Sequence, residues 1–459
     1  MLKYIGNMKV KNKFKRKLTV WQMLVLGYLA VIFAGAAMLC IPFATAEGQS
    51  TTFLNALFTA TSATCVTGLV PYDTAIHWSA FGQIVILILI QTGGLGFMTI
   101  VSMLFVAMRR GLNMYERTAL IQSTGQSKFY GIKRLLMRIL IGTLIFETFG
   151  LIMLSIRFIP EFGAGKGLYF ALWHSVSAYC NAGFDLMGAN YGAFSSLTHF
   201  AGDPIVSLTI DFLIIVGGLG FCVWSDIIDC KFNFKKFQLY TKVSLIMSAA
   251  LIVVPTAFFA LFERNNQTLE AFSGGEKFLI YLFMAISPRT AGFSVVDLSQ
   301  ISNSGYLLTC ILMLIGGSSG STAGGIKVTT VAVIFMGMIA VFRGKRDINI
   351  GKKRIKHALV SQALAIFMAY AFFVLVASLT ITSIEPDTSF SAIVFECLSA
   401  LGTVGLSINL TPNLSTASKI VLIFLMYLGR VGVLTLAYAL TKSRKTGEVR
   451  KPVDTLPLG

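Results

Sequence analysis

The amino-acid sequence predicts an all-α polytopic membrane protein in which four tandem repeats surround a pseudo-fourfold axis. The first observation is composition: 55% of the 459 residues are hydrophobic and 13% are charged. With a mean hydropathy of +0.76, the chain is too apolar for a soluble domain of this length. The second observation is a short glycine-ended motif that occurs four times. The third is a set of basic clusters that alternates with long apolar units.

The glycine-ended motif follows a short apolar run each time. Its copies occupy residues 65–68, 180–183, 289–292 and 402–405. The closing glycines, at positions 68, 183, 292 and 405, are 115, 109 and 113 residues apart. One copy alone would be weak evidence, because glycine-containing loops between helices are common. Four copies at a nearly constant period predict an internal repeat.

Long apolar runs predict eight membrane spans. Runs of about 20 residues, enough to cross a bilayer, begin near positions 20, 79, 137, 204, 243, 306, 358 and 419. The first run, residues 20–43, is longer than the ~7 to 15 residue apolar core of a secretory signal. We therefore expect it to be retained as a span.

Lysine and arginine, which give a formal net charge of +18, gather in five clusters between the apolar units. The clusters lie at residues 9–17, 109–138, 231–242, 343–356 and 442–451. Such a distribution argues against nucleic-acid binding. By the positive-inside rule all five clusters face the cytoplasm, which predicts that both termini are cytoplasmic. The clusters either only set this topology and contact anionic lipid, or also dock a partner.

The repeat divides the chain into five predicted regions. They are a cytosolic basic tail at 1–18, repeat 1 at 19–110, repeat 2 with a cytosolic linker at 111–230, repeat 3 at 231–342, and repeat 4 with a linker and C-terminal tail at 343–459. Outward spans are expected at 20–43, 137–159, 243–262 and 358–384. Half-helices, which are apolar helices too short to cross the membrane, are expected at 53–61, 168–179, 276–287 and 390–400. Each is expected to be followed by extended backbone, at 64–68, 180–184, 289–293 and 402–406. Return spans are expected at 78–108, 204–228, 306–341 and 419–440.

The fourth motif contains Thr-Val-Gly, the pattern with which potassium pores line themselves with backbone carbonyls. Four such segments predict a pseudo-fourfold pore, made by four repeats of span, pore loop and span, in which layers of carbonyl oxygens replace the water around a cation. The negative C-terminal ends of the half-helices would favour a cation there. The first predicted layer is Val66, Asn181, Thr290 and Thr403. The second is Thr67, Ala182, Ala291 and Val404. The third is Gly68, Gly183, Gly292 and Gly405.

The third return span is interrupted by a run that no helix would favour. It contains Gly316, Gly317, Ser318, Ser319, Gly320, Ser321, Thr322, Ala323, Gly324, Gly325, Ile326 and Lys327. Each interior glycine costs a helix about 1 kcal/mol relative to alanine, so we expect a loop inside the membrane at 316–327. The run lacks the Gly-Lys-Ser/Thr ending of a nucleotide-binding loop. It either gates the axis or only kinks the helix. Lys327 either holds a site at the cytoplasmic end or snorkels toward the headgroups, and we expect it to snorkel.

Isolated charged residues within the apolar runs are further candidates for functional residues. Arg430 lies deep in the last span, where a charge costs at least ~2.5 kcal/mol, so we expect it beside the glycine-rich loop as a positive barrier to cations. Arg289 is expected to anchor the end of its half-helix. Glu147, Asp211 and Glu396 either pair with other buried polar groups or serve the pathway. The seven cysteines and four histidines form no ligand pattern, so we expect no catalytic group and no metal beyond the permeating ion.

The four glycine-ended segments, the loop at 316–327 and Arg430 resemble those of the Trk/Ktr/HKT superfamily of potassium transporters, and within it the KtrB-type membrane subunits, over residues 20–442. The resemblance implies potassium uptake across a bacterial plasma membrane through a channel-like pore gated by the loop and Arg430. It also implies a homodimer on a cytosolic, KtrA-like, nucleotide-binding regulatory ring, and the sodium dependence of some members. This chain shows no nucleotide site of its own, so the expected ligands are potassium and sodium ions.

Glycine at all four motif ends goes with selection of potassium over sodium in this superfamily, which implies the same selectivity here. The glycines are followed by Leu69, Phe184, Phe293 and Leu406 rather than by Tyr-Gly, so we expect weaker selectivity than in potassium channels. The alternative is a multi-span secondary carrier for another monovalent cation. Such a carrier would need an inverted repeat with a midplane site, whereas the basic clusters give all four units one orientation.

Overall fold

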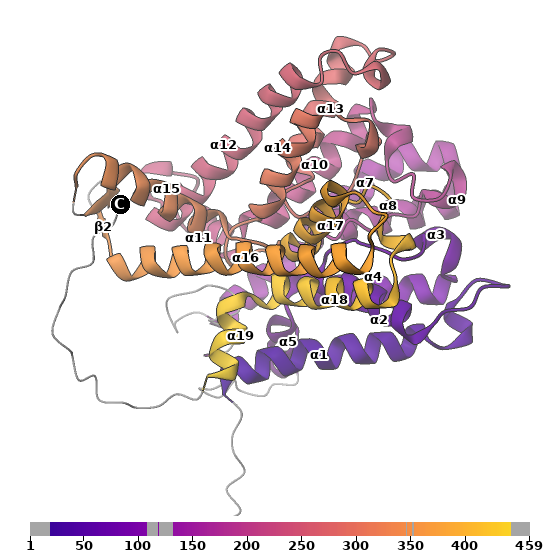
Figure 1. Cartoon of the computed structure of the whole chain (residues 1–459), viewed down its shortest axis with the longest axis horizontal. Helices are drawn as coiled ribbons and strands as arrows, with labels where there is room; N and C mark the ends of the chain where they lie inside the picture. Colours follow the sequence, from indigo (N-terminus) through magenta and orange to yellow (C-terminus); the bar gives the residue numbers. More distant parts are fainter. Residues whose placement is uncertain (1–18, 108–117, 119–131, 346, 351–352, 442–459) are drawn as a thin grey trace, which may run out of the picture.

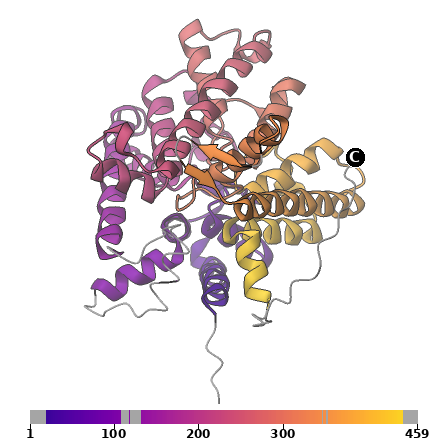
Figure 2. The same ribbon diagram turned by 90° about the vertical axis from the view of Figure 1, so that its left-hand side faces the viewer.

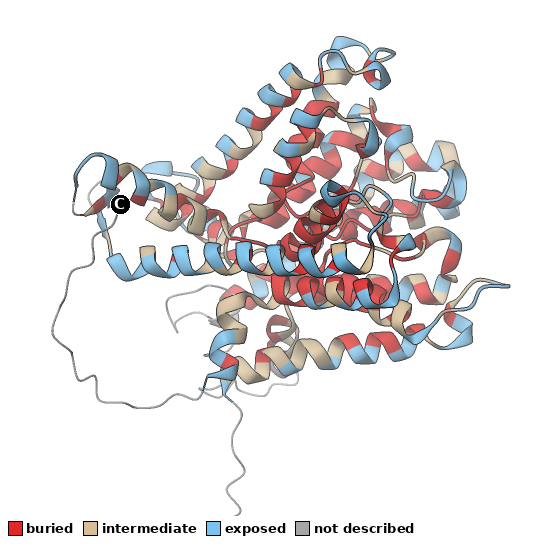
Figure 3. Cartoon of the chain, in the orientation of Figure 1, coloured by how far each residue is buried: buried red, intermediate tan, exposed pale blue. Residues whose placement is uncertain are grey.

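The structure is a computed structural model that describes residues 19–107, 118, 132–345, 347–350 and 353–441. It confirms the predicted all-α membrane fold. Within the described residues, four continuous helices are long and apolar enough to cross a membrane: α1 (Val20–Leu39), α7 (Ile132–Phe162), α12 (Leu239–Phe262) and α16 (His357–Ile384). Only 22–28% of their apolar stretches is buried, so these helices lie at the outside of the molecule with apolar side chains exposed (Figure 1 and Figure 3).

Four shorter helices follow the long ones and lie deeper in the molecule. They are α2 (Phe53–Cys65), α8 (Ala164–Cys180), α13 (Gly274–Ile286) and α17 (Phe390–Gly402). At ~1.5 Å per residue a helix of this length covers about 20 Å, which is less than the ~30 Å hydrocarbon core. Thr52, Ser273 and Ser389 cap three of them by accepting a hydrogen bond from a first-turn backbone N–H. Three of the half-helices therefore begin at a capping Ser or Thr, and all four end among buried residues.

Three of the four return segments are sharply bent rather than continuous. The pairs are α4 (Ala80–Leu95) with α5 (Phe97–Ala107), α10 (Pro204–Leu219) with α11 (Phe221–Asp229), and α18 (Thr416–Val431) with α19 (Val433–Leu440). They bend by 93°, 88° and 92°. The bends lie at Gly96, Gly220 and Gly432, whose φ values are +84°, +94° and +87°. Only glycine adopts this region without a steric penalty, so the glycine ends one helix and lets the next leave at a right angle.

The third return segment is broken by a loop, as expected. Helix α14 (Asn303–Leu314) ends before it and α15 (Val328–Phe342) begins after it. Not only the third return span but all four of the predicted return spans are interrupted or bent. Of the described helices, four pass as spans, or up to seven if each bent pair is one span. The positive φ at each bend glycine is the physical reason.

The return helices and half-helices close a ring. Each half-helix contacts the return helix that precedes it in the chain: α8 contacts α4, α13 contacts α10, and α17 contacts α14. The last return helix, α18, then contacts the first half-helix, α2. Figure 2 shows the same order, with the chain passing around the centre from indigo through magenta and orange to yellow. The core of the molecule is the inside of this ring.

The remaining elements are short. Helices α3 (Thr74–His77) and α9 (Gly188–Tyr191) contact each other. Strands β1 (Ile348–Ile350) and β2 (Lys353–Ile355) form an antiparallel pair within one basic cluster, which the sequence analysis did not anticipate. The described connections also contain single-turn 3-10 helices at Pro42–Ala44, Thr198–Phe200, Phe234–Lys236, Gln267–Leu269, Leu298–Gln300 and Thr411–Asn413.

Candidate cation pathway

The four motif glycines lie together at the centre of the ring. A Cβ atom built on Gly68 would lie 2.6 Å from the carbonyl oxygen of Ala182 and 3.2 Å from the Cα atoms of Gly183 and Gly405. A Cβ atom on Gly183 would lie 2.7 Å from the carbonyl oxygen of Ala291. The backbone of each segment therefore approaches the next one too closely for any side chain at these positions.

The other two glycines lie equally close to the backbone of the next segment, so the contacts close into a ring. A Cβ atom on Gly292 would collide with the carbonyl oxygen of Val404, and one on Gly405 with the carbonyl oxygen of Thr67. The glycine of each segment thus faces the second-layer carbonyl of the following segment, and the fourth segment faces the first. Four segments from distant parts of the chain share one axis.

The residues two positions before these glycines have left-handed backbone conformations. Val66, Asn181, Thr290 and Thr403 have φ values of +57°, +58°, +74° and +53°. The half-helix α2 also continues to Cys65, so the expectation of extended backbone from residue 64 is wrong. A left-handed non-glycine residue costs roughly 1–2 kcal/mol. The same strained conformation at four equivalent positions is typical of a functional segment that its surroundings hold in place.

A buried serine forms a hydrogen bond with the backbone of each segment, and none of the four serines was predicted. They are Ser62, Ser177, Ser287 and Ser399. Ser62 Oγ accepts the backbone N–H of Gly68 at 3.0 Å, and Ser399 Oγ accepts that of Gly405 at 3.1 Å. In the other two segments the hydroxyl bonds one residue further on. Ser177 accepts the Phe184 N–H at 3.1 Å and Ser287 donates to the Phe293 carbonyl. A signal existed: the serine precedes the glycine by six residues in three repeats and by five in the third.

A small cavity of about 90 Å³ lies over the third-layer glycines. Its lining includes those four glycines together with Asp73 and Asp185. Burial, followed by repulsion from Asp73, raises the pKa of Asp185 to about 7. Asp73 Oδ1 accepts the N–H groups of Ala75 and Ile76, and its Oδ2 accepts the N–H of Phe194 at 2.8 Å. Both carboxylates at this mouth were absent from the predicted site.

The glycine-rich loop lies against the opposite end of the four segments. The N–H of Ser318 donates to the Gly218 carbonyl at 2.9 Å, and that of Thr322 to the Gly217 carbonyl at 3.2 Å. The Thr322 hydroxyl donates to Asn181 Oδ1 at 3.3 Å. The loop is therefore held by the return helix of the second repeat and by a first-layer side chain.

Two loop glycines touch the first layer directly. A Cβ atom on Gly316 would lie 3.3 Å from Thr290 Cγ2, and one on Gly324 would collide with the side chain of Thr403. Together with the Thr322–Asn181 hydrogen bond, the loop therefore contacts first-layer residues of three of the four segments.

Arg430 reaches the loop from α18, as expected from the sequence. Its Nη1 donates to the carbonyl oxygen of Thr322 in the loop. Its Nη2 donates to the carbonyl oxygens of Gly93 and, at 3.3 Å, Gly94 in α4. One guanidinium therefore connects the loop, the first return helix and the last one.

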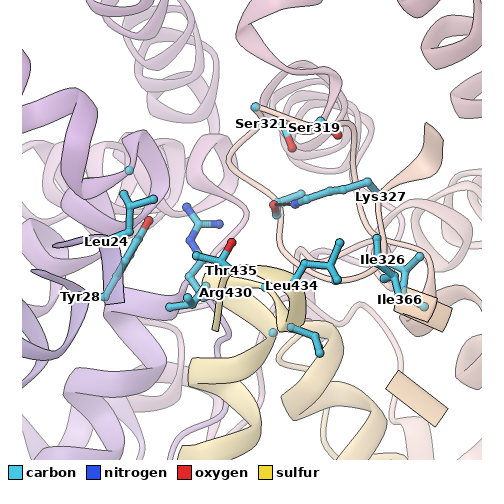
Figure 4. Close-up of a pocket in the computed structure, with 18 of the residues that line it drawn as sticks. Leu24, Tyr28, Ser319, Ser321, Ile326, Lys327, Ile366, Arg430, Leu434 and Thr435 are labelled. Carbon is cyan, nitrogen blue, oxygen red and sulfur yellow. Dashed lines mark hydrogen bonds between the residues drawn. The ribbon is translucent and has the colours of Figure 1, made fainter. Parts of the chain in front are cut away.

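Lys327 does not snorkel away from the loop, and that expectation is wrong. Its Nζ donates to the carbonyl oxygens of Ala323 at 2.7 Å and Gly324 at 3.3 Å. The break in the helix places these two loop carbonyls within hydrogen-bond distance of the ammonium. Figure 4 shows Lys327 and Arg430 entering the same cavity from different elements.

The other predicted charges have separate environments. Glu147 accepts a hydrogen bond from Gln91 Nε2 at 2.9 Å, whereas both carboxylate oxygens of Asp211 are buried without a hydrogen-bond partner among the described residues. Arg289 is buried and donates to Ser248 of α12, so it links the chain just after half-helix α13 to α12.

Glu396 of α17 is buried and connects its half-helix to the chain beyond the fourth segment. Its carboxylate accepts the hydroxyl of Ser407 and, at 3.1 Å, that of Thr411. It therefore supports the segment from outside the pathway. Within the described part of the chain, no group of three or more His, Cys, Asp or Glu could hold a metal ion.

Short helices whose C-terminal ends meet at a shared ring of glycines and carbonyls, inside a helical membrane fold, indicate a membrane transport protein. The comparison with known families makes this specific. The family described as TrkH, cation transport protein, matches residues 19–448, and the chain belongs to that family. It is therefore a multi-pass cation transporter rather than an enzyme, and the superfamily predicted from the sequence is confirmed.

Several relatives match almost the whole chain. The potassium/sodium uptake protein NtpJ of Enterococcus hirae is 39% identical over 455 residues, which cover 98% of this chain and 99% of that protein. The Ktr system potassium uptake protein B of Bacillus subtilis is 38% identical over 434 residues, with coverage of 94% and 95%. The crystal structure of the potassium transporter TrkH from Vibrio parahaemolyticus has a TM-score of 0.73 at 18% identity and covers 95% of this chain and 87% of that one. This structural likeness supports the fold.

Proposed function

We propose that the chain takes up potassium through the axis between its four glycine-ended segments. The ion exchanges its hydration water for the backbone carbonyls of three layers: Val66, Asn181, Thr290 and Thr403; then Thr67, Ala182, Ala291 and Val404; then Gly68, Gly183, Gly292 and Gly405. The single observation that carries this proposal is the cyclic approach of each glycine to the next segment's carbonyl. Ordinary loops between helices have no reason to close such a cycle.

The names of the relatives support potassium as the transported ion. NtpJ is called a potassium/sodium uptake protein, and two further relatives are Ktr system potassium uptake proteins. We therefore include sodium as a second ion of this chain. The Ktr system names also support a regulatory partner, which we propose to be a cytosolic nucleotide-binding ring that contacts a homodimer of this chain in the plasma membrane, with both termini cytoplasmic.

The glycine-rich loop and Arg430 form the gate in this proposal. The loop, residues 316–327, lies below the first layer, and Arg430 holds it through the Thr322 carbonyl. With the loop in this position a cation leaving the first layer meets backbone and a positive charge. Conduction requires the loop to move aside.

A glycine substitution in the third layer tests the proposed filter. Gly292→Ser places a side chain against the Val404 carbonyl and within 3.1–3.2 Å of the Cα atoms of Gly183 and Gly405. Potassium and sodium uptake by purified protein in liposomes should show a loss of discrimination against sodium. Gly275→Ser is the matched control, because a Cβ atom there meets nothing within 4 Å. A folded Gly292→Ser protein with unchanged selectivity would refute the filter.

A further inference from the structure

A cavity of about 340 Å³ lies below the glycine-rich loop, on the side of the molecule where α1 begins. Two of the described residues that line it are basic, Lys327 and Arg430, and none of them is acidic. Hydroxyl groups of Ser319, Ser321 and Thr435 also face this space (Figure 4). Two basic residues and no acidic one are unexpected in a cavity on a cation pathway, because their positive charges repel the transported cation.

Four helices begin at this cavity and add to its positive potential. They are the helices after the three bends and after the loop, namely α5, α11, α15 and α19, and their first residues or caps line the space. The caps of the last three, Gly220, Lys327 and Gly432, supply no side-chain acceptor to the helix N–H groups. A helix N-terminus is equivalent to about half a positive charge, and such termini bind anions.

Among the described residues, Lys327 and Arg430 donate their hydrogen bonds to neutral backbone carbonyls. Arg430 donates to the carbonyls of Thr322, Gly93 and Gly94, and Lys327 to those of Ala323 and Gly324. A phosphate oxygen is a stronger acceptor than a carbonyl for both groups, and the guanidinium matches it in a bidentate manner. An oxyanion in the cavity would compete for the donors that now hold the loop.

We propose that this cavity binds a phosphate-type oxyanion, either free phosphate or the headgroup of an anionic phospholipid. The bound anion draws Arg430 and Lys327 off the loop carbonyls and neutralises the chamber, so it favours the open pathway. The binding site stands on the cavity alone, whereas the effect on transport rests on the function proposed above.

Binding is tested first, on the purified full chain, with inorganic phosphate followed by 31P NMR. Lys327→Gln removes one of the two charges, and Lys236→Gln removes a matched charge from an exposed lysine outside the cavity. We expect saturable binding that Lys327→Gln weakens at least tenfold and Lys236→Gln leaves unchanged. Native mass spectrometry of protein from phosphatidylglycerol vesicles distinguishes the source. Lipid retained by the wild-type chain and lost from Lys327→Gln identifies the headgroup as the ligand, even without phosphate binding.

Transport is tested second, by thallium flux into phosphatidylcholine vesicles with phosphate or chloride at equal ionic strength, and into vesicles that contain phosphatidylglycerol. The identified ligand should raise the flux several-fold. Thr435→Glu, which places a carboxylate in the cavity, should raise flux without ligand and abolish the response to it. Absence of both phosphate and lipid binding, or equal losses in the two lysine variants, overturns the site. Binding without any thallium flux overturns the proposed function and leaves the anion site standing.

Discussion

Replacing Arg430 by glutamine distinguishes between two roles of the loop at 316–327: a gate on the pathway, or only a kink in the helix. The arginine donates to Thr322 in the loop and to Gly93 and Gly94 in α4. Glutamine is shorter and uncharged, so it cannot bridge the two elements. If the loop exchanges between a closed and an open position, the substitution removes an interaction made only in the closed one, and the open population should increase.

The size of the effect follows from the contact with the loop. A hydrogen bond from a charged donor contributes roughly 1.5–3 kcal/mol net. Only the bond to Thr322 depends on the position of the loop, because the other two remain within the helical framework. The open-to-closed ratio should therefore rise by roughly 10- to 150-fold, at 1.36 kcal/mol for each factor of ten. Loss of the positive charge adds to the increase by removing a barrier for the cation.

Thallium flux into vesicles measures this ratio as an initial rate at a fixed amount of protein. Arg138→Gln is the matched control, since Arg138 forms an ion pair with Asp229 at 2.6 Å, away from the loop. The thermal midpoint of both variants shows whether the protein is folded. A folded Arg430→Gln protein with wild-type or lower flux would refute the gate, and Arg430 would then have only a packing role.

Three further predictions follow from the same geometry. Ser399→Ala removes the side chain that accepts the Gly405 N–H, a hydrogen bond that contributes about 1 kcal/mol. The substitution should lower the potassium-to-sodium flux ratio several-fold. A fall in total flux at a constant ratio would contradict this support role. Burial and Asp73 raise the pKa of Asp185 to about 7, so this carboxyl is neutral below that pH and ionised above it. Apparent potassium affinity should increase as external pH rises through 7, and Asp185→Asn should abolish the pH dependence; a retained dependence would exclude this carboxyl. Deleting residues 317–322 should raise flux, and an unaffected rate would leave only the helix-kink explanation.

The position of the central segments could be predicted because each repeat carries the same short local sequence pattern. In each repeat a short apolar run is followed by a segment that ends in glycine, and this motif recurs at a nearly constant period. The left-handed residue two positions before the glycine was not predicted, because its residue type differs in the four repeats. The loop at 316–327 was predictable from its local sequence, because its five glycines together cost a helix about 5 kcal/mol relative to alanine.

The right-angle bends could not be predicted, although their glycines were visible. Gly96 and Gly220 belong to a shared pentapeptide at 93–97 and 217–221. A glycine inside an apolar helix is often tolerated at a cost of ~1 kcal/mol, so sequence alone does not distinguish a packed glycine from a bend. The pentapeptide contains both kinds: a Cβ atom on Gly93 would collide with the Thr64 carbonyl, whereas Gly96 changes the chain direction. The environment, not the residue type, decides between them.

The proposed gate requires that the four repeats be unequal. Three return segments turn away from the axis at a single glycine, which leaves space below the first layer. The third is interrupted by the loop at 316–327, which contacts side chains of the first layer. The loop is held by Gly217 and Gly218 of the second repeat and by Arg430 of the fourth, which in turn contacts Gly93 of the first. A pore made of four identical subunits would place four such loops on one axis, where they would collide. Four repeats fused in one chain allow a single loop, held by all the others, to close the path.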